Sequence, residues 1–233
     1  MINLPKFMRN CMLAKTNYFV PVELLQEALD NLPEDTYRIT LNKPTGNFFY
    51  DPWVIKDEFK NTVWDKLLSA IKEPVGEARI IKLESGQSYW SHADIDDRWH
   101  LGLSGNESYL IDLQSHELHK TQQDGVWYNM DAGKLHTAAN FGQVPRLQFV
   151  VRQLLRRTGL TNPVKIAISK AEDVFDYRYQ FDHVLSPYLN AINKQGIINN
   201  FSYKDDVVTF EIESAHVANL QDVVPKIFKV EIC

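Results

Sequence analysis

The sequence contains only two cysteines, Cys11 and Cys233, which stand near opposite ends of the chain. So few cysteines predict no disulfide framework and favour a reducing compartment. Long apolar runs are missing too, because no stretch approaches the roughly 18 consecutive apolar residues that a membrane-spanning helix needs. The first twenty residues lack the pattern of a secretory signal peptide. We therefore expect a cytoplasmic protein without a membrane partner.

Positive charge is also in short supply. The chain has 25 Lys and Arg against 30 Asp and Glu, which gives a formal net charge of −5. A nucleic-acid-binding surface normally shows clustered Lys and Arg. The only basic cluster, Arg152, Arg156 and Arg157, is interpreted as a solvated segment leaving the core. We expect no nucleic-acid partner.

The length of 233 residues, with 44% hydrophobic and 24% charged residues, suits a globular protein of one large domain or two smaller ones. A polar stretch with Gly and Pro at 156–163 predicts a boundary. We expect a main domain over residues 1–157 and a small α+β module over 158–233. No chemistry is apparent in this module, whose expected work is packing, homodimer formation or substrate presentation.

Hydrophobic spacing predicts helices at Val22–Leu32 and Glu58–Lys72. After them the sequence changes to short strand-like segments separated by turns. These segments are ARIIKLE, SYWSHAD, RWHLGL, YLIDL, ELHKTQ, GVWYNM, HTAANF and RLQFVVRQLL. Eight short strands predict a mainly β fold with flanking helices, in which the core is a double-stranded β-helix of the jelly-roll or cupin type.

The segment after residue 90 contains two histidines and a carboxylate with the spacing of a metal site: His92, Asp94 and His136. Two His and one carboxylate, with other positions open, suit non-haem Fe(II). Residues two apart on a strand point to the same side, so His92 and Asp94 can chelate together. Asp96 and Asp97 lie nearby and are alternative carboxylates, although the spacing favours Asp94.

Arg146 follows His136 by ten residues. Its guanidinium is a fixed positive charge that can hold a carboxylate with two parallel hydrogen bonds. A metal triad with a downstream Arg is the minimal set for a 2-oxoglutarate-dependent oxygenase. The alternatives left open are that His136 is an ordinary buried histidine, that Asp94 caps a turn, and that Arg146 is an exposed arginine of the barrel.

Four further histidines are interpreted as non-ligands. His116 and His119 are three residues apart in a predicted strand and would face opposite sides. His183 and His216 have no partner at ligand spacing.

Several motifs agree in order and spacing with one known family. They are R-W-H-L-G-L at Arg98–Leu103 and the frame W-Y-N-M-D…H-T-A-A-N-F-G…R-L-Q-F-V-V. Over about residues 75–155 the sequence resembles the aspartyl/asparaginyl β-hydroxylases, which are Fe(II)- and 2-oxoglutarate-dependent dioxygenases. The resemblance implies Fe(II) held by His92, Asp94 and His136, with O₂ as the second substrate. It also implies 2-oxoglutarate bound by Arg146, with Arg98 and His100 reaching the same cosubstrate.

The sequence departs from the family pattern at two positions. A serine that assists cosubstrate binding in some members would align near Ile81 and is absent. Asp94 stands where the animal members often have glycine, so the chain looks more like the bacterial branch, which includes amino-acid hydroxylases.

The resemblance implies hydroxylation of an aspartyl or asparaginyl side chain, of a free amino acid such as proline, or of a related small metabolite. The substrate would accordingly be an amino acid, a peptide or a small metabolite. The alternative is a non-catalytic or cosubstrate-independent cupin-type protein that binds a metal or metabolite. Succinate formation from 2-oxoglutarate separates the two.

Overall fold

The computed structural model of this chain describes residues 12–33, 37–155, 159–171, 177–224 and 227–233. The chain divides into two compact units, one over Cys11–Leu154 and the other containing Leu155–Cys233. Arg156 and Arg157 lie outside the described residues, so the expected domain boundary at residue 157 stays a prediction.

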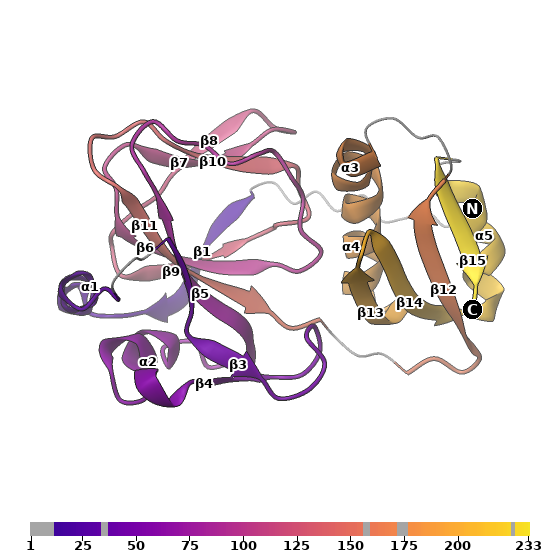
Figure 1. Cartoon of the computed structure of the whole chain (residues 1–233), viewed down its shortest axis with the longest axis horizontal. Coiled ribbons are helices and arrows are strands. Elements are labelled where there is room, and N and C mark those ends of the chain that lie inside the picture. The colour runs from indigo at the N-terminus through magenta and orange to yellow at the C-terminus, as the bar shows by residue number, and fades with distance from the viewer. Residues whose placement is uncertain (1–11, 34–36, 156–158, 172–176, 225–226) are drawn as a thin grey trace. The chain divides into compact units, whose positions relative to one another are not determined.

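The first unit is built from two antiparallel sheets that face each other (Figure 1). A six-stranded sheet has the order β1-β9-β6-β11-β5-β2, and a three-stranded sheet has the order β10-β7-β8. The strands are β1 (Leu13–Phe19), β2 (Arg38–Thr40), β5 (Val75–Leu83), β6 (Arg98–Ser104), β7 (Ser108–Asp112), β8 (Glu117–Lys120), β9 (Val126–Met130), β10 (His136–Asn140) and β11 (Arg146–Gln153). The expectation of a mainly β, cupin-like fold with flanking helices is confirmed.

The outer face of the six-stranded sheet carries the hydrophobic core. Alternate residues of its strands, such as Ile80, Leu101 and Phe149, pack against helices α1 (Val22–Asp30) and α2 (Val63–Leu68). Trp64 of α2 meets Phe149 edge-on, with ring centroids 6.1 Å apart. A short hairpin of β3 (Asn42–Pro44) and β4 (Trp53–Ile55) lies beside this layer. Burial of this apolar layer is the main force that holds the sheet flat against the helices.

The inner face of the same sheet is largely polar, because residues two apart on a strand share a face. The register aligns Gln148 of β11 with Ile81 of β5, and Val150 with Arg79. On its other side Val150 is aligned with His100 of β6. The strand period therefore places the cationic and amide side chains on the side that faces the three-stranded sheet.

Two local expectations were wrong, and one strand was missed. The segment SYWSHAD forms no strand, and only isolated bridges join Ser88 to Ala139 and His92 to His136. The helix expected over Glu58–Lys72 is a 3₁₀ turn at Asp57–Phe59, named η1, followed by α2 alone. Asn61 separates them with a φ of 59°, a left-handed conformation that interrupts a helix. Strand β1, which pairs with β9, was not expected at all.

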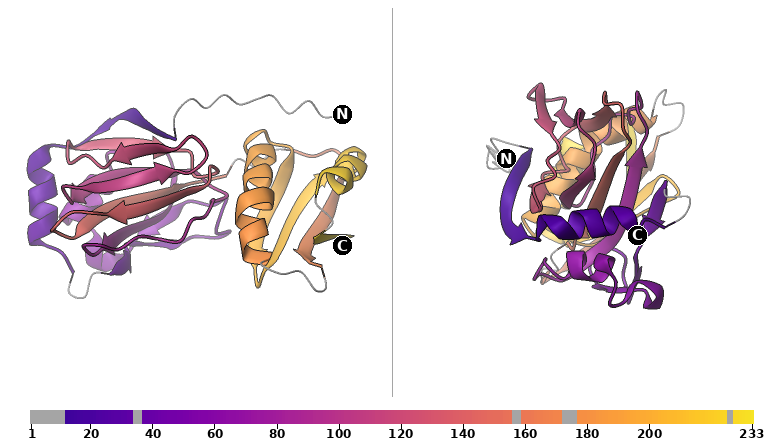
Figure 2. Two further views of the ribbon diagram at one scale, coloured as in Figure 1. Left: turned by 90° about the horizontal axis from the view of Figure 1, so that it is seen from above. Right: turned by 90° about the vertical axis from the view of Figure 1, so that its left-hand side faces the viewer.

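The second unit is an α+β fold around a four-stranded antiparallel sheet of order β13-β14-β12-β15. The run of α3, η2 and α4 lies on one face of this sheet and α5 on the other (Figures 1 and 2). Its elements are β12 (Pro163–Lys170), α3 (Tyr177–Gln180), the π-helical turn η2 (Phe181–Leu185), α4 (Ser186–Lys194), β13 (Ile198–Lys204), β14 (Val207–Glu213), η3 (Ser214–His216), α5 (Val217–Val223) and β15 (Phe228–Ile232). None of the described helices has the length and apolarity needed to cross a bilayer.

Candidate metal and carboxylate site

His92, Asp94 and His136 come together at one end of the space between the two sheets. One potential ligand atom from each lies within 4.8 Å of the others. The Nε2 atoms of His92 and His136 are 3.7 and 3.9 Å from the same atom, Oδ2 of Asp94. His92 and Asp94 belong to the loop between β5 and β6, and His136 is the first residue of β10.

The two imidazoles are oriented by the main chain. Nδ1 of His92 is 2.9 Å from the carbonyl oxygen of Trp90, and Nδ1 of His136 is 2.8 Å from that of Lys134. A carbonyl oxygen only accepts, so we assign the ring proton to Nδ1 in both residues. This tautomer leaves the lone pair of each Nε2 free to bind a metal, as in metal sites whose histidines are fixed from behind.

The protonation states also suit metal binding. Burial is the main cause that lowers the pKa of His136 to about 4, so its ring is neutral at pH 7. Burial works against the charged form of Asp94, but Arg98 and then the two imidazoles outweigh it and hold the pKa of Asp94 well below its ordinary value. The neutral imidazole of His136 and the ionised carboxylate of Asp94 are forms that bind a metal.

This donor set therefore fits a divalent transition metal such as Fe(II). Two imidazole nitrogens and one carboxylate oxygen are fewer donors than Fe(II) accepts, so positions would stay open for other ligands. The four histidines interpreted as non-ligands belong to other segments and do not line this site. His116 sits in a turn with a φ of 60°, and His119 lies in β8. Nδ1 of His183 is 2.8 Å from the Tyr179 carbonyl, and His216 is in η3.

A small cavity of about 80 Å³ connects the triad with the polar inner face of the six-stranded sheet. Its polar lining includes His92, Asp94, His136, Arg79, Tyr89, Arg98, His100, Arg146 and Gln148. The apolar remainder of the wall is Ile81, Leu110, Met130, Ala138 and Val150. The structure thus places every candidate site residue of the sequence analysis around one cavity.

Arg146 is a buried charge, and the described part of the chain supplies no counter-ion for it. The residue is 2% exposed, and its Nε has no hydrogen-bond partner. No acid among the described residues pairs with its guanidinium. Burial lowers the pKa of Arg146 to about 10, so the side chain stays positive at neutral pH. The alternative that Arg146 is an exposed arginine of the barrel is wrong. A buried cation without a partner is unfavourable, so binding of an anion in the cavity would stabilise it.

Two other polar groups of the cavity are unsatisfied as well. The hydroxyl of Tyr89 and Nε2 of His100 are buried without a hydrogen-bond partner among the described residues. Nδ1 of His100 is 2.8 Å from Oε1 of Gln148, and burial is the main cause that lowers the pKa of His100 to about 3. A buried polar group without a partner is costly, so a polar ligand in this cavity would stabilise the protein.

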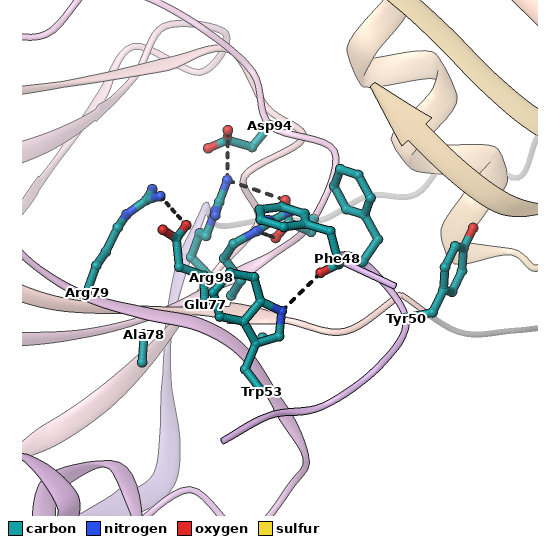
Figure 3. A network of polar contacts seen from close by, with 12 residues as sticks. Phe48, Tyr50, Trp53, Glu77, Ala78, Arg79, Asp94 and Arg98 are labelled. Carbon is teal, nitrogen blue, oxygen red and sulfur yellow. Dashed lines mark hydrogen bonds and ion pairs between the residues drawn. The ribbon is translucent and has the colours of Figure 1, made fainter. Parts of the chain in front are cut away.

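Arg98 contacts the carboxylate of the triad directly. Its Nη2 is 2.8 Å from Oδ1 of Asp94 and 3.3 Å from Oδ1 of Asp96, as the dashed lines on Arg98 in Figure 3 indicate. Both Asp94 and Asp96 raise the pKa of Arg98, against the effect of burial, which is larger than either alone. Oδ2 of Asp96 accepts a hydrogen bond from Nε of Arg152. Both oxygens of Asp96 are therefore in use, and Asp97 accepts a hydrogen bond from the backbone N–H of Ala132 at 3.2 Å.

Arg152 was expected to be solvated, and Arg79 was not among the expected site residues. Arg152 is not solvated, because it is 6% exposed and paired with Asp96. Arg79 lines the cavity, and its Nη1 is 2.8 Å from Oε2 of Glu77 (Figure 3). Strand alternation was a usable signal, since Arg146, Gln148, Val150 and Arg152 occupy every second position of one strand.

No known protein-family model matches the sequence, and no curated protein matches it. Matches are found among solved structures. A prolyl-4-hydroxylase from Pseudomonas putida is 16% identical, with a TM-score of 0.38 over 63% of this chain and 89% of that one. A non-heme monooxygenase, in the ThoJ–Ni complex, is 12% identical, with a TM-score of 0.36 over 64% of this chain and 76% of that one. At these scores we transfer no residue role from either structure, and membership of the β-hydroxylase family stays a prediction.

Proposed function

We propose that this chain is an Fe(II)- and 2-oxoglutarate-dependent dioxygenase that hydroxylates an aspartyl or asparaginyl side chain, a free amino acid or a related small metabolite. The observation that carries the proposal is Arg146, which lines the same cavity as the triad. Its guanidinium is buried and has no acidic partner among the residues that the structure describes. A dicarboxylate with one end at the metal and the other at Arg146 would satisfy both ends of the cavity.

The residues of the cavity would have different roles, set by the chemistry of their side chains. His92, Asp94 and His136 would hold the metal, and at neutral pH His136 is neutral and Asp94 is ionised, as metal binding requires. Arg146 would neutralise the distal carboxylate of the cosubstrate. The hydroxyl of Tyr89 would donate a hydrogen bond to a bound oxygen, and Nε2 of His100 would accept one from a ligand N–H or O–H.

Fe(II), when bound, supplies the reaction with O₂ that couples decarboxylation of 2-oxoglutarate to hydroxylation of a C–H bond. The chain contributes geometry, charge and exclusion of water. The apolar wall formed by Ile81, Leu110, Met130 and Val150 keeps bulk water from the cavity, which strengthens every electrostatic interaction inside it.

The test is succinate formation. Protein loaded with Fe(II) under anaerobic conditions is mixed with 2-oxoglutarate, O₂ and a panel of amino acids and short Asp- or Asn-containing peptides. We expect one class of compound to raise succinate formation and to gain the mass of one oxygen atom. Succinate formation that needs no Fe(II), or a wild-type protein that binds no 2-oxoglutarate, would contradict the proposal and favour a cosubstrate-independent cupin.

A further inference from the structure

A chain of four alternating charges leads from Asp94, the proposed metal ligand, to Arg152, which is aligned with Arg98 on the neighbouring strand. Asp94 contacts Arg98, Arg98 contacts Asp96, and Asp96 contacts Arg152. Asp96, Arg98 and Arg152 are 2%, 6% and 6% exposed, so these pairs lie in an environment of low polarity. Only Asp94 and Arg98 line the cavity. Asp96 and Arg152 can therefore influence it only through Arg98.

We propose that Asp96 and Arg152 are positioning residues, which keep one oxygen of Asp94 available for the metal. Arg98 has a planar fork that tends to bind both oxygens of a carboxylate at once. Here its Nη2 is shared, at 2.8 Å from Asp94 and 3.3 Å from Asp96. Asp96 draws Arg98 away from a two-point grip on Asp94. Oδ1 of Asp94 is thus occupied by Arg98, while Oδ2 faces the two imidazoles.

Arg152 keeps Asp96 in position beside Arg98 by donating a hydrogen bond to the other oxygen of Asp96, Oδ2. Its guanidinium carbon lies 4.1 Å from the ring centre of Phe48 and 4.7 Å from that of Phe49. The turn that carries these rings is closed by a hydrogen bond from the indole N–H of Trp53 to the Phe48 carbonyl, seen in Figure 3. The two rings lie against Arg152, the last of the four charges. Water therefore competes poorly for Arg152, and its pairing with Asp96 is strengthened.

A buried chain of charges is a poor way to gain stability alone, because removing charges from water offsets much of their attraction. Because the four charges end at Asp94, the proposed metal ligand, we assign them a role in metal binding and not in stability alone. Partners that orient a ligand from behind commonly change metal affinity by about 10–100-fold when they are removed. The inference rests on the metal-binding part of the proposed function and not on the substrate.

The test measures Mn(II) affinity of the full chain by electron paramagnetic resonance. We expect Asp96→Asn to weaken Mn(II) binding about 10–100-fold, because Arg98 then closes on both oxygens of Asp94. Arg152→Gln should weaken it in the same direction by a smaller factor. The matched control is Arg178→Gln, which removes a 2.9 Å ion pair with Asp182 in the other unit and should leave affinity within about twofold.

A second-site variant separates positioning from general damage. If Arg98 blocks Asp94 once Asp96 is neutral, then adding Arg98→Gln to Asp96→Asn should restore part of the lost affinity. Merely structural damage would grow with the second substitution. If Asp96→Asn does not fold, Arg152→Gln with and without Arg98→Gln makes the same comparison.

Three outcomes overturn the inference. Asp96→Asn and Arg152→Gln could both fold and bind Mn(II) like wild type, or the double variant could bind more weakly than Asp96→Asn alone. In either case the proposed function stands and the positioning role fails. Wild-type protein that binds no Mn(II) would instead overturn the proposed function, and this inference with it.

Discussion

His92 and His136 are held against each other by two reciprocal backbone hydrogen bonds. The N–H of each residue donates to the carbonyl oxygen of the other, and both distances are 2.9 Å. Their ring centres are 4.4 Å apart. Two ligands that are distant in the sequence thus share one main-chain bridge, so their spacing does not depend on side-chain packing alone. The pair is preorganised for a metal before any metal arrives.

We predict that His92→Ala and His136→Ala each abolish stoichiometric binding of Fe(II) or Mn(II), because two remaining donors do not hold these metals firmly. His116→Ala and His119→Ala are the controls, since neither belongs to the triad. Metal content after dialysis is the measurement. Unchanged metal content in His136→Ala would mean that the ligands are assigned wrongly.

Arg146→Ala should weaken 2-oxoglutarate binding by about 2–5 kcal/mol, the usual loss when one partner of a buried charge pair is removed. Arg146→Lys should restore binding only in part, because the ammonium lacks the two-pronged fork. Calorimetric titration of the Mn(II) protein measures both. Equal affinity in Arg146→Ala would move the carboxylate contact to another arginine of the cavity.

Replacing Arg146 should weaken 2-oxoglutarate binding but stabilise the ligand-free protein. Since its buried Nε has no partner, Arg146→Met should raise the free energy of unfolding by about 1–3 kcal/mol, the penalty of an unsatisfied buried polar group. Urea unfolding without 2-oxoglutarate gives this value. A destabilised Arg146→Met variant would indicate that Arg146 is satisfied inside the protein and does not await an anion.

Stability of the ligand-free protein should fall in mild acid through His100. Burial lowers the pKa of His100 to about 3, so the folded protein keeps the ring neutral while the unfolded chain takes up a proton near pH 6.5. The stabilisation that the lowered pKa of His100 gives the folded protein is therefore complete above about pH 6.5. It is lost as the pH falls towards 3, at up to about 1.4 kcal/mol per pH unit. His100→Gln should flatten the profile of unfolding free energy between pH 7 and 4. Parallel profiles would contradict the shift.

The second unit is expected to take no part in metal or cosubstrate binding. We predict that a chain ending near Arg157 still binds Fe(II) and 2-oxoglutarate, because every residue of the cavity precedes that point. In the full chain, His183→Ala and His216→Ala should keep full metal content. A soluble, folded truncation that binds no metal, or loss of metal in either variant, would show that the second unit contributes to the site.

Strand periodicity made much of the first unit predictable, because one apolar face and one polar face leave an alternating pattern in β5, β6 and β11. Strand β1 was not predicted, because LAKTNYF has no buried position and its apolar pattern is weak. The helix expected at Glu58–Lys72 was too long. Phe59 continues the apolar spacing, yet it lies in a 3₁₀ turn that the backbone at Asn61 separates from α2.

The candidate site, like the fold, was only partly predictable from the sequence. The ligand set and Arg146 could be proposed from residue type and spacing. The pairing of Asp96 with Arg152 could not, since the partners are 56 positions apart and only the alignment of β6 with β11 brings them together. Arg152 lies near the end of an apolar strand and precedes two more arginines. Sequence alone therefore favoured a solvated cluster over a buried ion pair.

The most direct test of the central claim is the visible absorption spectrum of the Fe(II)-loaded protein as 2-oxoglutarate is added without O₂. A cosubstrate bound through its keto acid to Fe(II) gives a charge-transfer band. We predict that the band appears and saturates at one 2-oxoglutarate per chain. It should be absent in His136→Ala and need far more 2-oxoglutarate in Arg146→Ala. No band in wild-type protein that demonstrably contains Fe(II) would contradict the account.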